Sequence, residues 1–311
     1  MQPLDSALDL IRRNYIFPDV AAEVIAAIEA RAAAGEYDDL DEETLAARVT
    51  GQFHAISNDK HLRLLVRLPD HRAATTEAEA EAAWAEAQRL GNHHIAAVQR
   101  LDGNVGYVDL RGVASPGDGG TAIAAAMELV THTGALIFDL RRNKGGDPDG
   151  VQLWNSYLFP DSDTHLNDIY DGGTTRTRQF WTLAYVPGRR YLDRPVYVLT
   201  SSFTFSAGEE FAYNLKALGR ATLIGEVTRG GAHPTARFPV SATLEVAVPH
   251  ARSINPVTGT NWEGVGVEPN VSVPPAQALA TAHRLALQAL LAKADAADKP
   301  EIVEALAGLG G

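Results

Sequence analysis

The sequence predicts an α/β protein with a partly parallel sheet and an all-helical N-terminal segment. From residue 104 on, short apolar runs alternate with helical patterns, which is typical of βαβ units. Residues 3–57 instead repeat apolar side chains at helical spacing. A chain of 311 residues with 45% apolar residues can form one large domain or two moderate ones.

The N-terminal helices are predicted from apolar spacing and charge. Residues 4–11 and 20–28 each place apolar side chains on one helix face. Three consecutive acidic residues at 41–43 suit the positive N-terminal end of a third helix. We therefore expect a helical subdomain over residues 1–60 and an α/β core over residues 61–311.

Within the core, each element is predicted from its own pattern. Residues 61–68 alternate as a strand does, and residues 75–103 contain an Ala- and Glu-rich stretch that forms a linker or a helix. The expected strands are 105–110, 135–140, 195–200 and 221–225, the helices are 122–132, 206–218 and 276–293, and the hairpins are 165–183 and 236–250.

Composition excludes several classes of function. The formal net charge of −12 argues against nucleic acid or an anionic membrane as a partner, and it favours solubility. The absence of cysteine excludes disulfides, thiolate metal sites and a cysteine nucleophile. The N-terminus lacks a signal-peptide pattern and no apolar run would span a bilayer, so we expect a cytoplasmic protein. His and acidic residues show no metal-ligand spacing, so we expect neither a metal nor another cofactor.

A candidate nucleophile lies where the strand 195–200 turns into a helix. Ser206 would stand at the helix N-terminus, where free N–H groups and the helix dipole stabilise developing negative charge. Serine is also a common N-cap without any catalytic role. Because Ser201, Ser202 and Thr204 are rival hydroxyls, the local pattern does not select one of them.

A pair of glycines, Gly145 and Gly146, follows the predicted strand 135–140. Paired glycines let a backbone approach a ligand closely and direct N–H groups toward it. The pair is either half of an oxyanion hole or an ordinary tight turn. The chain has no GxxxxGK[ST] motif, which disfavours a phosphate-binding loop.

Seven stretches of the chain can be compared with known families. They are YIFPDVA (15–21), SNDKHLRL (57–64), NVGYVDL (104–110), FDLRRNKGG (138–146), TSSFTFSAGEEFAYNLK (200–216), IGEVTRGGAHP (224–234) and WEGVGVEPNVSV (262–273). Together they resemble the tail-specific, or C-terminal processing, serine peptidases. The similarity is greatest to the branch that includes the repeats of interphotoreceptor retinoid-binding protein. The resemblance implies a ClpP/crotonase-like spiral core after the helical subdomain.

The resemblance also implies a set of catalytic positions. The family nucleophile matches Ser206 in Ser-Ala-Gly-Glu, and the oxyanion donors match the backbone N–H of Ala207 and that of Gly145 or Gly146. Many members carry a catalytic Lys in the loop that matches residues 225–234. That loop has no Lys here, which rules against a simple Ser–Lys dyad.

Tricorn-like members use a His and a Glu instead, and these match His61 and Glu263. Histidine can take the serine proton near neutral pH, while a carboxylate orients the ring and stabilises imidazolium. Lys60 stands where those members have a Ser. His233 lies in the loop where other members have the Lys, so it is a rival base. We assign Lys60 and His233 to substrate binding.

The first hypothesis is therefore a serine peptidase that acts on peptides or proteins through an acyl-enzyme. One alternative is a non-proteolytic protein that binds a hydrophobic small molecule such as a retinoid or lipid. Another is an esterase or acyl transferase on the same fold. The stretch between His61 and Asn104 is too short for a PDZ domain, so tethering through one is not expected. The oligomeric state stays open, and a homo-oligomer is allowed.

Overall fold

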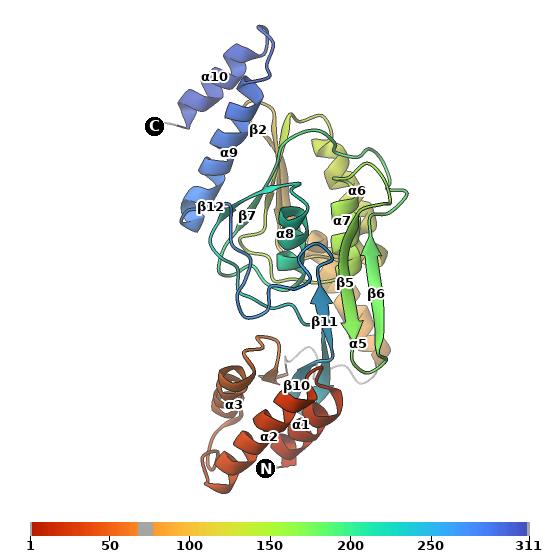
Figure 1. Cartoon of the computed structure of the whole chain (residues 1–311), viewed down its shortest axis with the longest axis vertical. Helices are drawn as coiled ribbons and strands as arrows, with labels where there is room; N and C mark the ends of the chain where they lie inside the picture. The colour runs from red at the N-terminus through yellow and green to blue at the C-terminus, as the bar shows by residue number, and fades with distance from the viewer. Residues whose placement is uncertain (1, 68–76, 310–311) are drawn as a thin grey trace. The chain divides into compact units, whose positions relative to one another are not determined.

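Figure 1 shows the computed structural model, which describes residues 2–67 and 77–309. It divides into two compact units, and each is described by itself. The first unit comprises Met1–Trp84, Asp168–Gln179 and Gly231–Ile254, and the second comprises Ala85–Asn167, Phe180–Gly230 and Asn255–Gly311.

The first unit combines three helices with a small antiparallel sheet in the order β1-β10-β9. The helices predicted from the periodicity of the N-terminal sequence are confirmed. Strands β9 and β10 form the second predicted hairpin. The elements are α1 (Gln2–Asn14), α2 (Pro18–Ala33), α3 (Glu42–Ser57), β1 (Arg63–Val66), β9 (Thr235–Pro239) and β10 (Leu244–Pro249).

One apolar core joins the helices of this unit to its sheet. Ile11, Val24 and Phe53 are fully buried in a cluster that also contains Leu64 and Val246 from the strands. We predicted a helical subdomain that ends at residue 60. In the structure these helices bury their apolar faces against strands that all follow residue 60 in the chain, because three short helices offer too little apolar surface to one another.

The second unit is built on a six-stranded sheet in the order β12-β8-β7-β4-β3-β2. Only the β2–β3 pair is antiparallel, so the predicted partly parallel α/β core is confirmed. The strands are β2 (Ile95–Leu101), β3 (Val105–Leu110), β4 (Ala135–Asp139), β7 (Val196–Thr200), β8 (Thr222–Gly225) and β12 (Val271–Ser272).

Helices cover both faces of this sheet. Ile137 and Leu199 belong to the cluster that packs against α9, while the ring of Phe138 makes edge contacts with Trp154 and Phe211 on the opposite face. Figure 1 shows α10 beside α9 at the C-terminal end of the chain. The helical elements are α5 (Glu77–Leu90), η1 (Asn92–His94), α6 (Pro116–Val130), α7 (Pro148–Ser156), α8 (Ala207–Ala217), α9 (Pro275–Leu291) and α10 (Lys299–Gly308).

Helices α6 and α7 differ from the prediction, and their N-cap residues explain where each helix begins. Helix α6 begins at Pro116 rather than at residue 122, because the Ser115 side chain accepts a hydrogen bond from the Asp118 N–H and proline suits the first helical turn. Helix α7 was not predicted. Asp147 caps it in the same way.

The third sheet, in the order β11-β5-β6, contains the first predicted hairpin. It consists of β5 (His165–Asp171), β6 (Arg176–Trp181) and β11 (Ala251–Ile254). Asp171 accepts hydrogen bonds from the N–H and the hydroxyl of Thr174, each at 2.7 Å, which closes the turn between β5 and β6. The division between the two units falls within β5 and β6.

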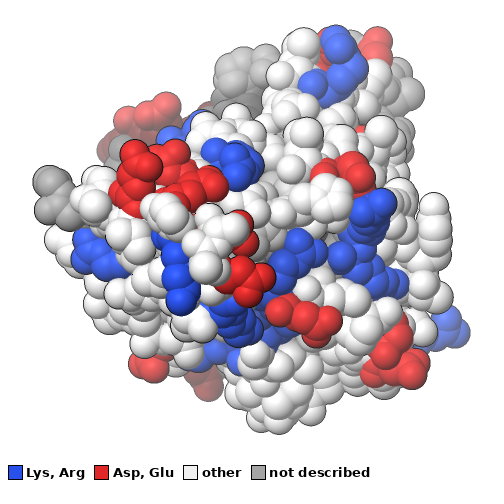
Figure 2. All heavy atoms as spheres, turned by 90° about the horizontal axis from the view of Figure 1, so that it is seen from above, with Lys and Arg blue, Asp and Glu red and all other residues white. Residues whose placement is uncertain are grey.

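The surface mixes charges of both signs. Figure 2 shows acidic and basic side chains interspersed on the face that it views. No helix within residues 2–67 and 77–309 combines the length and the apolar composition that crossing a membrane requires.

Candidate active site

Ser206 lies in the turn between β7 and α8 and has an unusual backbone. Its φ of 55° and ψ of −123° lie in a region that residues other than glycine rarely adopt. Such strain persists only where the surroundings enforce it, and it concentrates at functional sites. Ser206 stands directly before Ala207, the first residue of α8, where the free N–H groups of the helix are available.

The rival hydroxyls have structural partners. Ser201 donates to the Arg141 carbonyl at 2.6 Å, and Thr204 donates to the Leu140 carbonyl at 2.8 Å. Both side chains thereby fix the turn to the loop after β4. Of the four candidate residues Ser201, Ser202, Thr204 and Ser206, only Ser206 has a positive φ.

The predicted glycine pair lies against this serine. A Cβ on Gly145 would be 2.7 Å from the Ser206 Cβ and 3.3 Å from the Ala207 nitrogen, so only glycine permits the approach. The φ values of +97° at Gly145 and +146° at Gly146 also require glycine. The second unit thus brings together the predicted nucleophile and all three predicted oxyanion donors.

Asn143, which the sequence analysis missed, holds the glycine loop in place. Its Oδ1 accepts the Gly145 N–H at 2.8 Å, and its Nδ2 donates to the Leu110 carbonyl at 2.9 Å. The Phe205 N–H donates to the Asn143 carbonyl at 3.1 Å. The Gly145 N–H is therefore already donated within its own loop.

A second missed residue, Glu209, fixes the nucleophile turn from the other side. Its side chain is fully buried, and it accepts the Ser206 N–H at 2.9 Å and the Gly230 N–H at 2.6 Å. It also accepts the Thr228 hydroxyl, which in turn accepts the Val267 N–H at 2.7 Å. One carboxylate therefore connects the nucleophile to the loop where relatives carry Lys. The Ser-Ala-Gly-Glu motif contained this signal as an N-cap box.

The neighbouring Glu210 is buried in a different environment. Burial raises its pKa to about 8, although hydrogen bonds with Asn167 and Asn214 act in the opposite direction. The charges of Asp147 and Asp149 raise the pKa further. Glu210 is therefore largely protonated at neutral pH.

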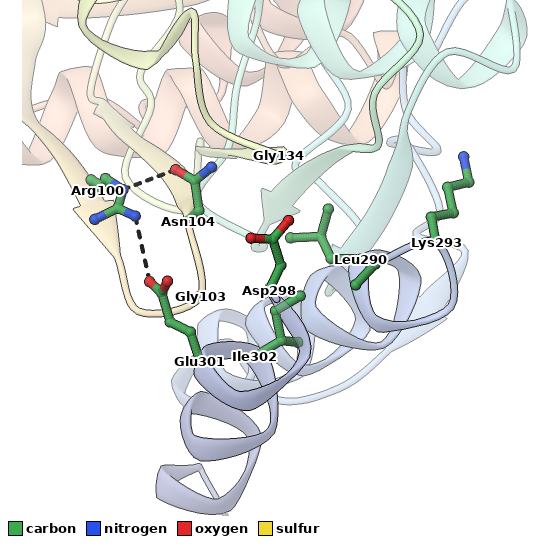
Figure 3. Close-up of a pocket in the computed structure, with 10 residues that line it drawn as sticks. Arg100, Gly103, Asn104, Gly134, Leu290, Lys293, Asp298, Glu301 and Ile302 are labelled. Carbon is green, nitrogen blue, oxygen red and sulfur yellow. Dashed lines mark hydrogen bonds and ion pairs between the residues drawn. The ribbon is translucent and has the colours of Figure 1, made fainter. Parts of the chain in front are cut away.

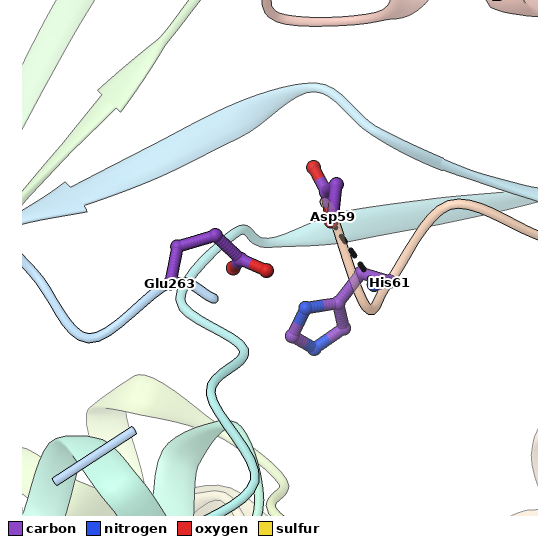
Figure 4. Close-up of side chains that lie close together, drawn as sticks. All are labelled: Asp59, His61 and Glu263. Carbon is purple, nitrogen blue, oxygen red and sulfur yellow. Dashed lines mark hydrogen bonds between the residues drawn. The ribbon is translucent and has the colours of Figure 1, made fainter. Parts of the chain in front are cut away.

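The predicted base His61 lies in the first unit, in the loop between α3 and β1. Asn58 ends α3 in the left-handed conformation, with a φ of 53°. The Asp59 side chain then accepts the backbone N–H of His61 at 3.0 Å (Figure 4). The Lys60 carbonyl accepts the Arg63 guanidinium at 2.6 Å, so the whole loop is fixed by local hydrogen bonds.

His233, also in the first unit, is buried beside the same loop. It is 5% exposed, and its Nδ1 lies 2.7 Å from Asp59 Oδ2. The ring of Phe17 packs edge-on against the imidazole at 5.3 Å. Burial alone would raise the pKa of Asp59, but the hydrogen bond and charge of His233 hold it below the ordinary value. The assignment of His233 to substrate binding stays a prediction.

Glu263 belongs to the second unit. It follows Asn261, whose side chain accepts the Glu263 N–H at 2.9 Å. Its predicted role as the orienting acid likewise stays a prediction.

One cavity of the second unit is lined by none of the predicted site residues. It has a volume of about 380 Å³ and lies between the β2–β3 turn and helices α9 and α10 (Figure 3). Arg100 there bonds to Asn104 at 2.8 Å and pairs with Glu301 at 3.4 Å, and no serine or histidine lines it. This cavity therefore lacks the side chains that nucleophilic catalysis requires.

Comparisons with known proteins agree with this arrangement. The family described as Peptidase family S41 matches residues 104–273, and the N-terminal domain of that family in eukaryotic IRBP matches residues 2–98. A photosystem II D1 C-terminal processing protease has a TM-score of 0.53 at 15% identity, with 88% of this chain and 92% of that chain covered.

Two further solved structures share the fold. A lipoprotein from Streptococcus agalactiae has a TM-score of 0.58 at 12% identity, covering 93% of this chain and 97% of that one. The tricorn protease has a TM-score of 0.56 at 16% identity, covering 98% of this chain but 36% of that one.

Fold and family define a serine-type peptidase, as the sequence predicted. The chain belongs to peptidase family S41. The predicted ClpP-like core with a helical N-terminal part is confirmed, and family membership implies peptide or protein substrates.

Proposed function

We propose that the protein hydrolyses peptide bonds through an acyl-enzyme on Ser206. The observation that carries the proposal is the strained Ser206 backbone at the start of α8, against a glycine pair that tolerates no side chain. A hydrophobic-ligand carrier has no use for a strained serine packed against a glycine pair. An acyl-transfer enzyme uses a serine nucleophile and backbone N–H groups that stabilise the oxyanion.

In the proposed reaction, the Ser206 Oγ attacks the substrate carbonyl while His61 takes the hydroxyl proton. The N–H groups of Ala207 and Gly146 donate to the resulting oxyanion. Collapse of the intermediate expels the amine, which takes the proton from His61, and water then hydrolyses the acyl-enzyme by the same route. Glu263 would orient His61 and stabilise its charged form.

This mechanism draws on both units, because His61 belongs to the first and Ser206 and Glu263 to the second. Support for His61 over a lysine base comes from the 225–234 loop, which contains no Lys.

A fluorophosphonate probe tests the nucleophile. Wild-type protein should be labelled, and Ser206→Ala should lose labelling. Ser202→Ala is the matched control, since Ser202 is an exposed serine of the same turn whose hydroxyl donates to Glu226. Retained labelling of Ser206→Ala would assign the nucleophile elsewhere.

A second assay separates peptidase from esterase or acyl transferase. A peptide library and a set of activated esters are offered to the same enzyme. We expect peptide cleavage that Ser206→Ala abolishes. Ester turnover with intact peptides would favour the esterase, and labelling without any turnover would favour an acyl transferase that awaits its acceptor.

Tail-specific cleavage and a cytoplasmic location are proposed on the sequence alone, and the oligomeric state stays open. Mass spectrometry of the library products tests whether cleavage concentrates near C-termini. Fractionation of cells that express the full native gene tests location, and light scattering tests self-association.

A further inference from the structure

Asp59 is a buried carboxylate that holds three parts of the first unit together. It is 1% exposed. Its Oδ1 accepts the His61 backbone N–H at 3.0 Å, and its Oδ2 accepts the Tyr15 hydroxyl at 3.0 Å and lies 2.7 Å from the His233 Nδ1. Its own N–H donates to the Ser57 hydroxyl at 3.1 Å. The carboxylate thus links the end of α1, the 231–234 segment and the turn that carries His61.

A buried carboxylate at position 59 contributes little to the stability of the folded protein by itself. Removing a carboxylate from water is costly, and a buried pair of this kind is often no more stabilising than apolar side chains of the same volume. The hydrogen bonds of Asp59 with Tyr15 and His233 offset part of that cost. Phe17 packs against the rings of both residues. The arrangement therefore calls for a role that an apolar residue cannot fill.

Asp59 acts on His61 in two ways. Its bond to the backbone N–H fixes the direction in which the side chain of residue 61 leaves the chain. A ring nitrogen of His61 also lies within 4.8 Å of an Asp59 oxygen, where a negative charge stabilises imidazolium.

We propose that Asp59 is a positioning residue for His61, and that Tyr15 and His233 hold its carboxylate in place. The inference rests on the proposed function, in which His61 is the base. It assigns His233 to the support of the base rather than to substrate contact, and it makes Tyr15, at the far end of α1, part of the catalytic apparatus.

Other titratable groups surround this carboxylate and enter any pH measurement. Lys60 is its chain neighbour, and His54 on α3 senses the charges of both Asp59 and Lys60. Burial lowers the pKa of His54, and the charges of Arg63 and Lys60 lower it further. Tyr15 contributes a hydroxyl and His233 an imidazole.

The test measures the second-order rate of fluorophosphonate labelling against pH, a readout that needs no natural substrate. Asp59→Asn should lower the rate by about 10- to 100-fold at neutral pH, as expected when a reacting group is misplaced by a fraction of an ångström to an ångström. It should also move the acidic limb of the profile to lower pH, because the charge that favours imidazolium is gone. A merely structural role would leave the position of that limb unchanged.

Asp41→Asn is the matched control. Asp41 also uses its carboxylate to accept a backbone N–H in the first unit, from Thr44 at 2.7 Å, but it caps α3 and is exposed. Asp41→Asn should leave both the labelling rate and its pH profile as they are in the wild type. Circular dichroism checks that each variant is folded.

Tyr15→Phe supplies the answer if Asp59→Asn does not fold. It removes one hydrogen bond from Oδ2 and keeps the charge, so the rate should fall about fivefold with the acidic limb in place. A wild-type rate in folded Asp59→Asn, or in Tyr15→Phe where Asp59→Asn is unfolded, would overturn the proposal.

Two further variants separate this proposal from the proposed function. If Ser206→Ala and His61→Ala lose labelling while folded Asp59→Asn keeps it, the peptidase mechanism stands and the role of Asp59 is wrong. If His61→Ala labels as the wild type does, there is no base for Asp59 to position, and both fail.

Discussion

Replacing Glu210 by glutamine should stabilise the protein, and increasingly so as the pH rises. The side chain is fully buried, and its pKa of about 8 lies well above the ordinary 4.5. Between these values the folded state holds a proton that the unfolded state releases, so the stability of the wild type falls as pH rises. Glutamine keeps the shape and the polar contacts but has no proton to lose.

The size of the effect follows from the two pKa values. Holding the carboxyl protonated in the folded protein costs about 3 kcal/mol at pH 7 and about 1 kcal/mol at pH 5. The difference in unfolding free energy between Glu210→Gln and wild type should therefore grow by about 2 kcal/mol between pH 5 and 7. All other titrating groups are common to both proteins and cancel in this difference.

Urea unfolding at pH 5, 6 and 7, monitored by tryptophan fluorescence, measures this difference in unfolding free energy. Three of the four tryptophans, Trp154, Trp181 and Trp262, lie in the second unit with Glu210, so most of the fluorescence signal comes from that unit. Glu268→Gln is the matched control, because Glu268 is an exposed carboxylate in the same unit. Parallel stability curves for wild type and Glu210→Gln would refute the reasoning.

Three further variants probe the site and its support. Gly145→Ala should reduce fluorophosphonate labelling by 100-fold or more, because its Cβ would lie 2.7 Å from that of Ser206; near-normal labelling would mean that the loop shifts freely. Glu209→Gln should lower kcat more than it changes KM in peptide cleavage, because an amide cannot accept as strongly from the Ser206 N–H; an effect confined to KM would contradict this. Asp139→Asn should cost stability at neutral pH: burial would raise the pKa of Asp139, but hydrogen bonds from Arg141 and Tyr107 hold it below the ordinary value. That stability is present above the unfolded pKa of about 4 and is lost as pH falls through the lower folded value, so thermal unfolding should converge for the two proteins in acid.

Most helices and strands of this protein, and several of its candidate site residues, could be predicted from the sequence. Periodicity gave the N-terminal helices and the strands of the second unit, because a helix face and a buried strand must repeat apolar residues at their own periods. Cap residues could have corrected the start of α6 and revealed α7, since Ser115 and Asp147 both precede a proline. The family resemblance placed Ser206 and the glycine pair, and the two lie together in the structure.

Other features depend on residues that only folding brings together. Nothing near position 59 in the sequence indicates that Asp59 meets Tyr15 and His233, because the partners lie 44 and 174 residues away along the chain. The strain at Ser206 is likewise a property of the packed turn, enforced by Glu209 and by the loop that Asn143 holds. Sequence patterns record what each segment requires of its own neighbours. The environment of a buried charge is set by whichever distant segments exclude water from it, so the tertiary structure alone decides its partners and its pKa.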